Sequence, residues 1–342
     1  MAEGLSYREA GVDLDAADRA KARLKKLVDA TRDTNTLSEL GSFGGLYAVP
    51  EGLRAPVLVA SADGVGTKLK VAIRAGRCDT VGRDLVNHCV NDILVHGARP
   101  LFFLDYLAVG ELDERVVTEV VAGVACGCRE NGCALLGGET AQMPDFYALG
   151  EYDLAGFVVG VVERDRVLDG SAVREGDHLI ALASTGLHTN GYTLARRIVF
   201  DQLGLGPDDP FPETGRSVAE ELLAPHRSYL ELLLPLLAQG RVHALAHVTG
   251  GGIPGNLPRV LPEGMGAVIE RTSWRLPDVF RALQRAGGVP RDEMDRVFNM
   301  GVGMIAIVSR SEGDAVLAAL AASGETAWVL GQVEPGSGVR YA

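Results

Sequence analysis

The chain has 342 residues, of which 47% are hydrophobic and 23% are charged, and this composition is typical of a folded protein with about two domains. Its formal net charge of −12, without any stripe of Lys and Arg interleaved with aromatic residues, argues against nucleic acid as a partner. An acidic protein that handles phosphates needs local cations, either basic side chains or bound Mg²⁺.

The lengths of the apolar runs and the pattern of the first residues predict the compartment. The apolar runs are far shorter than the roughly 20 residues of a membrane span, and the first residues lack the basic and then apolar pattern of a signal peptide. We therefore expect a cytoplasmic protein without a membrane partner. The five cysteines are expected to be reduced, and the spacing of Cys126, Cys128 and Cys133 lacks the matching Cys or His pair of a zinc site.

The first predicted element is a short basic amphipathic helix over residues 16–30, which includes Lys25. It leads into a loop with three glycines in five residues, Gly41, Gly44 and Gly45. Glycine has unusual backbone freedom, so this pattern predicts a mobile loop.

An apolar strand at 56–60 then runs into a turn that offers a carboxylate, two glycines, a hydroxyl and an ammonium. These are Asp63, Gly64, Gly66, Thr67 and Lys68. Such a turn lets the backbone approach an oxyanion and lets the carboxylate hold a divalent cation, as in a nucleoside triphosphate site. The spacing is not that of a Walker A loop, and a plain strand–turn–helix corner remains the alternative.

The carboxylates near the ends of the next elements predict a metal site. Helices are expected at 80–96 and 113–130, and strands at 101–109, 134–136 and 154–162. Three carboxylates beside glycines or at element ends could together hold Mg²⁺, which prefers a few carboxylates with waters and phosphate oxygens. They are Asp63, Asp92 and Glu139.

Two alternatives stay open for these carboxylates. One is a helix cap, a solvated helix residue and a turn residue without any metal. The other is zinc on the helix that carries His88, Asp92 and His96 at four-residue spacing, although each step drifts around the helix.

A polar stretch at 165–177 predicts a domain boundary near residue 170, with an N-terminal domain at 1–170 and a C-terminal domain at 171–342. The second half begins with a strand at 178–183 and continues with alternating helices and strands. A loop at 184–191 carries His188 and Asn190 between a strand and a helix, where a substrate-contacting group can project. A surface loop histidine is the alternative for His188.

The glycines Gly250, Gly251 and Gly252 follow a strand that ends near His247, which is expected to be a buried core histidine. With Gly255 they imitate a dinucleotide-binding fingerprint, but Pro254 falls inside the turn and the helix beneath the pyrophosphate is cut short. A turn that binds a smaller phosphate remains plausible.

Taken together, the segments of the chain resemble the phosphoribosylformylglycinamidine cyclo-ligase family, nearly from end to end. The first turn and Gly-Gly-Glu-Thr recur in a wider group of ATP-using enzymes, and four other segments narrow the match. The segments that carry the resemblance are residues 6–13, 41–45, 63–69, 89–92, 100–106, 137–141, 188–192, 247–252 and 298–304.

The resemblance implies an α+β fold with two α/β-type domains and mixed sheets, and a homodimer whose N-terminal strands form a barrel. It implies ATP and Mg²⁺ as cofactors and formylglycinamidine ribonucleotide as substrate. ATP would phosphorylate the formamide oxygen, and a nitrogen of the amidine would then close the imidazole ring as phosphate leaves.

Roles follow for the matched positions. The resemblance and the chemistry assign ATP to Lys25, Gly41, Gly44, Gly45 and the turn from Asp63 to Lys68, with Asp63 and Lys68 also catalytic. His188 and Asn190 would contact the substrate or transfer a proton, and Gly250, Gly251 and Gly252 would bind the ribose phosphate. Asp63, Asp92 and Glu139 would hold Mg²⁺.

Departures from the family pattern are modest. The family does not call for histidine at 88 or 96, which weighs against zinc there. Two other classes stay open, a different ATP enzyme of the same group, such as a small-molecule kinase, and a non-catalytic nucleotide-binding dimer.

Overall fold

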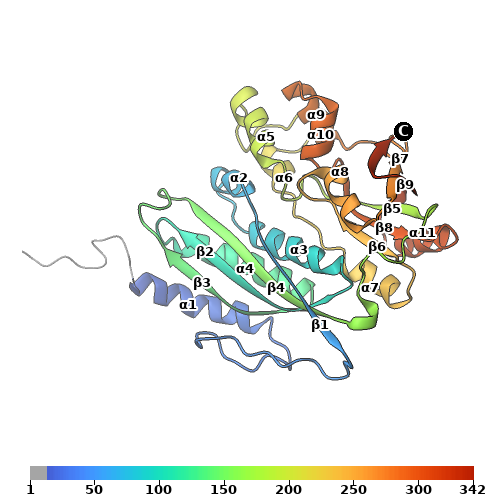
Figure 1. Cartoon of the computed structure of the whole chain (residues 1–342). Helices are drawn as coiled ribbons and strands as arrows, with labels where there is room; N and C mark the ends of the chain where they lie inside the picture. The colour runs from blue at the N-terminus through green and yellow to red at the C-terminus, as the bar shows by residue number, and fades with distance from the viewer. Residues whose placement is uncertain (1–13) are drawn as a thin grey trace, which may run out of the picture.

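The structure is a computed structural model that describes the backbone of residues 14–342 and the side chains of residues 18–342. The segment 6–13, which contributes to the family resemblance, lies outside the described residues. Two sheets organise the chain, the first between residues 56 and 163 and the second between residues 178 and 341 (Figure 1). The predicted boundary at residue 170 falls in the segment that joins them.

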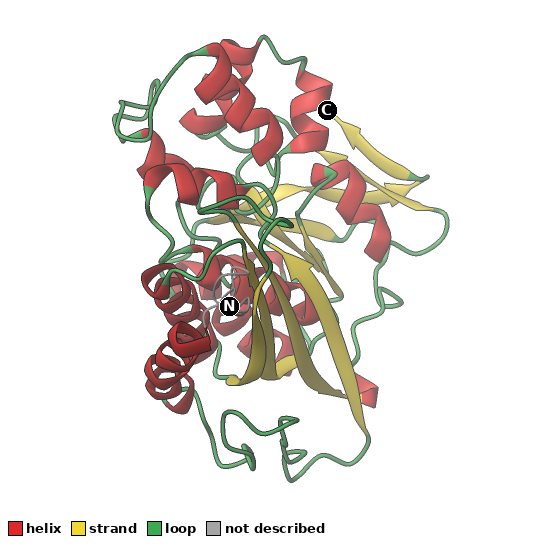
Figure 2. Cartoon of the chain, turned by 90° about the vertical axis from the view of Figure 1, so that its left-hand side faces the viewer, coloured by secondary structure: helices red, strands yellow, loops and turns green. Residues whose placement is uncertain are grey.

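The N-terminal domain places helices on one face of a four-stranded sheet (Figure 2). The strand order is β1-β4-β2-β3, and the sheet is mixed because β4 runs antiparallel to both neighbours while β2 and β3 are parallel. Its elements are α1 (Leu14–Asp29), β1 (Pro56–Gly64), α2 (Lys68–Ala75), α3 (Val81–Leu94), β2 (Arg99–Val109), α4 (Glu114–Glu130), β3 (Ala134–Gln142) and β4 (Tyr152–Glu163).

Local chemistry explains how two of these helices begin and pack. Asp113 caps α4, because its side chain accepts hydrogen bonds from the backbone N–H groups of Arg115 and Val116. α3 and α4 then cross closely at Gly82, where a Cβ atom would lie 2.2 Å from the carbonyl oxygen of Val120. This close crossing brings α3 to the middle of the molecule, where most of its side chains are buried.

The C-terminal domain is built on a six-stranded mixed sheet of order β10-β7-β9-β5-β8-β6. Its strands are β5 (His178–Ala183), β6 (Ala244–His247), β7 (Met265–Ile269), β8 (Val302–Val308), β9 (Ala327–Pro335) and β10 (Gly338–Tyr341). Its α-helices are α5 (Tyr192–Arg196), α6 (Val218–Leu222), α7 (Leu230–Ala238), α8 (Gly252–Asn256), α9 (Asp278–Gly287), α10 (Arg291–Val297) and α11 (Gly313–Ala322). Three further helical segments are η1 (Arg164–Arg166), which follows β4, and η2 (Arg197–Gln202) and η3 (Leu257–Val260) of the C-terminal domain.

The two domains share one hydrophobic core, which runs from α3 and α4 into α6, α7 and α9. Polar contacts fix the junction as well. Asp84, Asn87 and Asn91 on α3 exchange hydrogen bonds of 2.6 to 3.0 Å with the backbone of residues 226–229. Buried polar side chains need such partners, so the polar residues of α3 dock the C-terminal domain.

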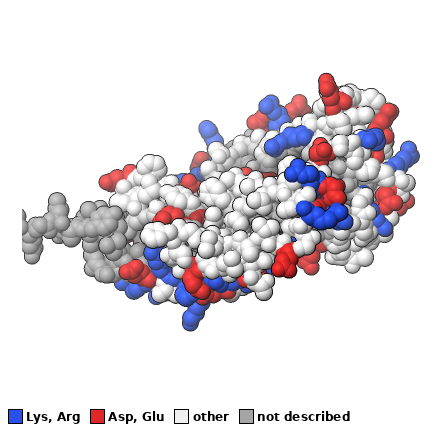
Figure 3. All heavy atoms as spheres, turned by 60° about the horizontal axis from the view of Figure 1, so that its bottom comes forward, with Lys and Arg blue, Asp and Glu red and all other residues white. Residues whose placement is uncertain are grey.

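The outer face of the first sheet is apolar and poorly covered. Leu58 on β1 is 62% exposed and Phe157 on β4 is 45% exposed. Charged side chains are sparse over the middle of the molecule on the face shown in Figure 3. No helix of the described chain has the length and apolarity needed to span a membrane.

Candidate functional site

Asp63 lies near the end of β1 at the edge of the first sheet, just before the turn that leads into α2. Asp63 is half-exposed, and one of its oxygens accepts a 2.6 Å hydrogen bond from the N–H of Gly64. Gly66 has φ of 61°, a left-handed conformation that favours glycine, and α2 starts two residues later. The Thr67 hydroxyl lies 3.1 Å from that of Thr193 on α5, so the turn faces the C-terminal domain.

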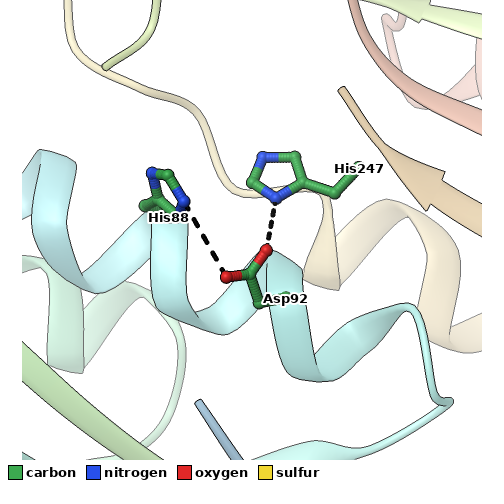
Figure 4. A group of neighbouring side chains, drawn as sticks. All are labelled: His88, Asp92 and His247. Carbon is green, nitrogen blue, oxygen red and sulfur yellow. Dashed lines mark hydrogen bonds and ion pairs between the residues drawn. The ribbon is translucent and has the colours of Figure 1, made fainter. Parts of the chain in front are cut away.

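Four side chains from three elements meet beside this turn, and we call them the junction cluster: Asp63, His88, Asp92 and His247. His88 Nε2 lies 2.9 Å from an Asp63 oxygen and 3.8 Å from an Asp92 oxygen. His247 Nδ1 lies 2.8 Å from the other Asp92 oxygen. His88 and Asp92 stand one helical turn apart on α3, and His247 ends β6 (Figure 4).

Further polar groups hold the imidazoles of the junction cluster. His88 Nδ1 lies 2.7 Å from the Thr189 hydroxyl, and His247 Nε2 lies 3.1 Å from Nε2 of His226. The Ser61 hydroxyl donates to Asp92 at 3.2 Å. His88, His247 and Asp92 therefore each have a hydrogen-bonding neighbour outside the cluster that helps to fix their orientation.

The histidines of the junction cluster lower the pKa of both of its carboxylates. Burial by itself disfavours their charge, but the hydrogen bond and charge of His88 lower the pKa of Asp63, and His247 and His88 lower the pKa of Asp92. Burial also disfavours a charged His88, yet its contacts with both carboxylates raise its pKa. For His247 burial outweighs Asp92, and its pKa is lowered.

Lys68 lies elsewhere than expected. Its side chain is fully buried, with Nζ 2.8 Å from an oxygen of Asp84, which is also fully buried; we call these two residues the buried pair. Nζ also donates to the carbonyls of His188 and Ala224, at 3.1 and 2.8 Å. The prediction that Lys68 neutralises phosphate charge is corrected, because its ammonium links the domains instead of facing solvent.

Positive charge near the turn comes instead from arginines that sequence reasoning missed. A hollow of about 210 Å³ beside Thr193 is lined by Arg74, Arg196 and Arg197, together with Phe200 and Asp201. The Arg74 guanidinium lies over the Phe200 ring, 4.2 Å from its centroid. The adjacent pair Arg196-Arg197 in an acidic chain was the available signal, but only the fold brings Arg74 to it.

Glu139 is far from the other proposed metal ligands within one chain. Across the sheet, Asp63 pairs with Gly156, Gly156 with Asp105, and Asp105 with Gly138, the neighbour of Glu139. Three strand spacings, about 14 Å, separate these positions. The prediction that Asp63 and Glu139 hold one ion is therefore corrected for a single chain, whereas Asp63 and Asp92 both lie beside His88.

The glycine loop also lies on the β3 side of the sheet. A bridge between Thr36 and Tyr47 closes it, and a Cβ atom at Gly45 would touch Leu136 of β3. Gly41 and Gly44 are exposed, with no heavy atom within 4 Å of an added Cβ atom. Lys25 forms ion pairs with Asp29 and Glu39 at 2.9 and 3.3 Å. Within one chain these residues do not reach the Asp63 turn.

His188 packs against other buried rings of the C-terminal domain. Its side chain is fully buried, its Nε2 accepts a 3.1 Å hydrogen bond from the Thr185 N–H, and its ring stacks on His226 at 4.0 Å. Burial and neighbouring cations hold its pKa well below the ordinary value. The His188 ring is closed off from solvent in this chain, and its predicted role in proton transfer stays a prediction.

Asn190 and the glycine turn do come together. An added Cβ atom at Gly250 would lie 3.3 Å from the Asn190 side-chain oxygen, and the Asn190 amide nitrogen is buried without a hydrogen-bond partner. At Gly252 a Cβ atom would collide with the Asp295 carbonyl, so close packing alone requires that glycine. Gly251, with φ of 97°, lies between them. An unpartnered amide beside this turn is suited to a polar ligand.

Among the residues of the site, the histidines are the hardest to identify from the sequence around them. His226 and His247 reach the cluster from the C-terminal domain, and nothing in the sequence around His226 marks it. The zinc alternative on one helix is wrong in its third member, since His96 is exposed. Among residues with described side chains, His88, Asp92 and His247 form the group whose ligand atoms lie within 4.8 Å of one another.

The chain matches two protein-family models over most of its length. "AIR synthase related protein, N-terminal domain" matches residues 51–162, and the corresponding C-terminal domain matches residues 174–342. A phosphoribosylformylglycinamidine cyclo-ligase of Sorangium cellulosum is 54% identical over 331 residues, covering 96% of this chain and 95% of its own. One of Geobacter metallireducens is 52% identical, covering 97% and 96%.

Solved structures with low sequence identity share the fold. A thiamine-monophosphate kinase from Stenotrophomonas maltophilia K279a aligns with a TM-score of 0.70 at 20% identity, over 96% of each chain. The hydrogenase maturation protein HypE in complex with ATP aligns with a TM-score of 0.68 at 19% identity, over 93% of this chain and 86% of its own.

Proposed function

Because the chain belongs to the phosphoribosylformylglycinamidine cyclo-ligase family, we infer that it catalyses the ATP-dependent ring closure of formylglycinamidine ribonucleotide in purine biosynthesis. The products are 5-aminoimidazole ribonucleotide, ADP and phosphate. The observation that carries this conclusion is identity above 50% along almost the whole length of curated relatives with that name.

The reaction proceeds in two chemical steps. The formamide oxygen attacks the γ-phosphorus of ATP, the bond to ADP breaks, and an iminophosphate forms. The amidine-derived nitrogen then attacks the formyl carbon, the carbon–oxygen bond breaks and phosphate leaves with the former formamide oxygen. Phosphorylation is needed because an unmodified formyl oxygen is a very poor leaving group.

The turn after β1 and the arginine hollow serve ATP in this proposal. Asp63 and Asp92 are ionised and adjacent, so they fit a divalent cation such as Mg²⁺, which would neutralise charge on the triphosphate. Arg74, Arg196 and Arg197 take the role first assigned to Lys68. Backbone N–H groups of the turn orient the phosphates toward the substrate.

The substrate binds across the junction from this turn. The buried amide of Asn190 donates to the ribonucleotide, and Gly250, Gly251 and Gly252 accept its ribose phosphate against the backbone. His188 contributes indirectly, because it stacks on His226 and thereby orients the imidazole that contacts His247.

A homodimer completes the site. The outer face of the first sheet has exposed apolar side chains at Leu58 and Phe157, and stacking two such faces into a barrel removes them from water. A partner copy can then bring its own β3 side, with Glu139 and the glycine loop at 41–45, toward Asp63. Closure of that loop would exclude water and suppress ATP hydrolysis.

The dimer has its own test. Light scattering is expected to give twice the chain mass, and Phe157→Lys is expected to give the monomer because it buries an unpaired charge in the interface. A dimer that tolerates this substitution would place the interface elsewhere. We propose the cytoplasm as the compartment.

The reaction is tested by following phosphate release and imidazole formation in parallel, with ATP, Mg²⁺ and formylglycinamidine ribonucleotide. We expect both products in equal amounts, and only when the ribonucleotide is present. A phosphorylated product without ring closure would identify a kinase, and folded protein without substrate-dependent turnover would overturn the assignment.

A further inference from the structure

Two of the four side chains in the junction cluster are imidazoles, which Mg²⁺ does not prefer as ligands. Mg²⁺ selects carboxylate, carbonyl and water oxygens in octahedral geometry, whereas imidazole nitrogens suit first-row transition metals. Two imidazoles, His88 and His247, face the same carboxylate of Asp92 from opposite sides (Figure 4).

We propose that His88, Asp92 and His247 form a binding site for a first-row transition-metal ion, with Asp63 as a further carboxylate ligand. The proposal deepens the proposed function at one point, the identity of the ion at Asp92. It rests on that function only for the use of the ion in the reaction, because binding itself depends on these side chains alone.

The spacing of the ligand atoms fits such an ion. The three candidate ligand atoms lie within 4.8 Å of one another. Ligand bonds of 2.0 to 2.2 Å place neighbouring ligand atoms about 3 to 4 Å apart, so small side-chain rotations around His88 would close the shell. His88 and Asp92 come from one face of α3 and His247 from β6, so rigid elements of both domains position them.

The groups behind the ligands fit as well. Imidazoles that bind a metal usually hydrogen-bond through their second nitrogen, which fixes the tautomer. His88 Nδ1 has Thr189 at 2.7 Å, and His247 Nε2 has His226 at 3.1 Å. The Asp92 oxygen that faces His88 also accepts a hydrogen bond from the Ser61 hydroxyl at 3.2 Å.

The charge and the solvent exposure of the junction cluster also favour a bound divalent cation. Two carboxylates at one site are balanced best by a divalent cation. The imidazoles are buried, with side chains 5% and 3% exposed, while Asp63 is 41% and Asp92 28% exposed. The site is thus closed behind the histidines and open on the carboxylate side, where water or a phosphate oxygen can complete the shell.

Mn²⁺ is the probe that separates this site from a magnesium site. After dialysis against a chelator and without nucleotide, the chain is titrated with Mn²⁺ while electron paramagnetic resonance counts the free ion. We expect one tight Mn²⁺ per chain that a tenfold excess of Mg²⁺ does not displace. The bound ion should show electron spin-echo modulation from imidazole nitrogen.

His88→Ala and His247→Gln are expected to weaken Mn²⁺ binding about 100-fold or more. The matched control is His96→Ala, which removes an exposed histidine two residues beyond the end of α3 and should leave binding unchanged. If a variant fails to fold, the nitrogen modulation on the unmodified chain still decides the question.

Two results would overturn the proposal: bound Mn²⁺ without nitrogen modulation, or displacement of Mn²⁺ by a tenfold excess of Mg²⁺. Neither affects the ring-closure assignment, which is measured separately by product formation with Mg²⁺. Conversely, metal binding through nitrogen in a chain without ring-closing activity would retain the site and remove only its proposed use.

Discussion

The junction cluster and the buried pair start from the same turn and end on the same helix, but they differ in access. Asp63 and Lys68 are five residues apart, and their partners His88 and Asp84 are four residues apart on α3. The junction cluster keeps two ionised carboxylates open to solvent on one side, whereas the buried pair is closed on every side. The segment from Asp63 to Lys68 therefore places its first residue at the candidate site and its last residue in a buried contact between the domains.

The strongest way to break this comparison is to remove the ammonium of the buried pair. Lys68→Met leaves Asp84 as an uncompensated buried charge, and the free energy of unfolding is expected to fall by about 3–5 kcal/mol. Denaturant unfolding followed by circular dichroism measures it. Adding Asp84→Leu should recover much of the loss, because a buried ion pair can often be replaced by apolar groups.

Lys70 provides the control for that experiment. It lies on the same helix, but it pairs with Glu151 and both side chains are substantially exposed. Lys70→Met is therefore expected to change stability by less than about 1 kcal/mol. Equal losses at positions 68 and 70 would contradict the special role of the buried pair.

The pH dependence of stability gives a further comparison between open and buried acidic groups, because Asp105 is buried without a charged partner among the described residues. Burial raises the pKa of Asp105 on β2 to about 7, the opposite direction from Asp63 and Asp92. Because the folded form holds this proton above the unfolded pKa of about 3.9, its stabilising effect is complete below pH 4 and is lost as pH rises to 7. The slope is about 1.4 kcal/mol per pH unit.

Unfolding titrations between pH 5 and pH 8 test this. Asp105→Asn should remove the corresponding part of the slope, since the amide does not titrate. An unchanged slope in this variant would mean that Asp105 is ionised in the folded chain.

The smallest expected effect concerns the cations that stay open. Arg196→Ala should raise the KM for ATP about tenfold, roughly 1.4 kcal/mol, with the KM for the ribonucleotide unchanged. Arg310, an exposed arginine after β8, gives the matched control. If both variants bind ATP like the unmodified chain, the hollow does not serve the triphosphate.

The sequence predicted the fold well where pattern and contact are both local. The turn after β1, the helix around Asp92 and the strand at 101–109 all occur as expected, because hydrophobic periodicity and glycine spacing determine them. It could not tell that Lys68 is turned inward, since burial depends on Asp84 and on carbonyls more than 100 residues away.

The same limit explains the site. Asp63 and Asp92 were predicted together and both lie beside His88, but Glu139 lies three strands away because the strand order is not the sequence order. His247 joins the junction cluster, and His226 contacts His247, only through the packing of the two domains. Asp84, Asn87 and Asn91 on α3 were a sequence feature that could have indicated the surface where the two domains dock.

The most direct test compares Asp63→Asn with the unmodified chain in one preparation, by substrate-dependent phosphate and imidazole formation and by unfolding. The amide keeps the shape but removes the charge that faces the metal and triphosphate. We predict loss of turnover by at least about 1000-fold, or roughly 4 kcal/mol, with the free energy of unfolding nearly unchanged. Near-normal turnover, or an unfolded variant, would contradict an open catalytic Asp63 beside a closed structural Lys68.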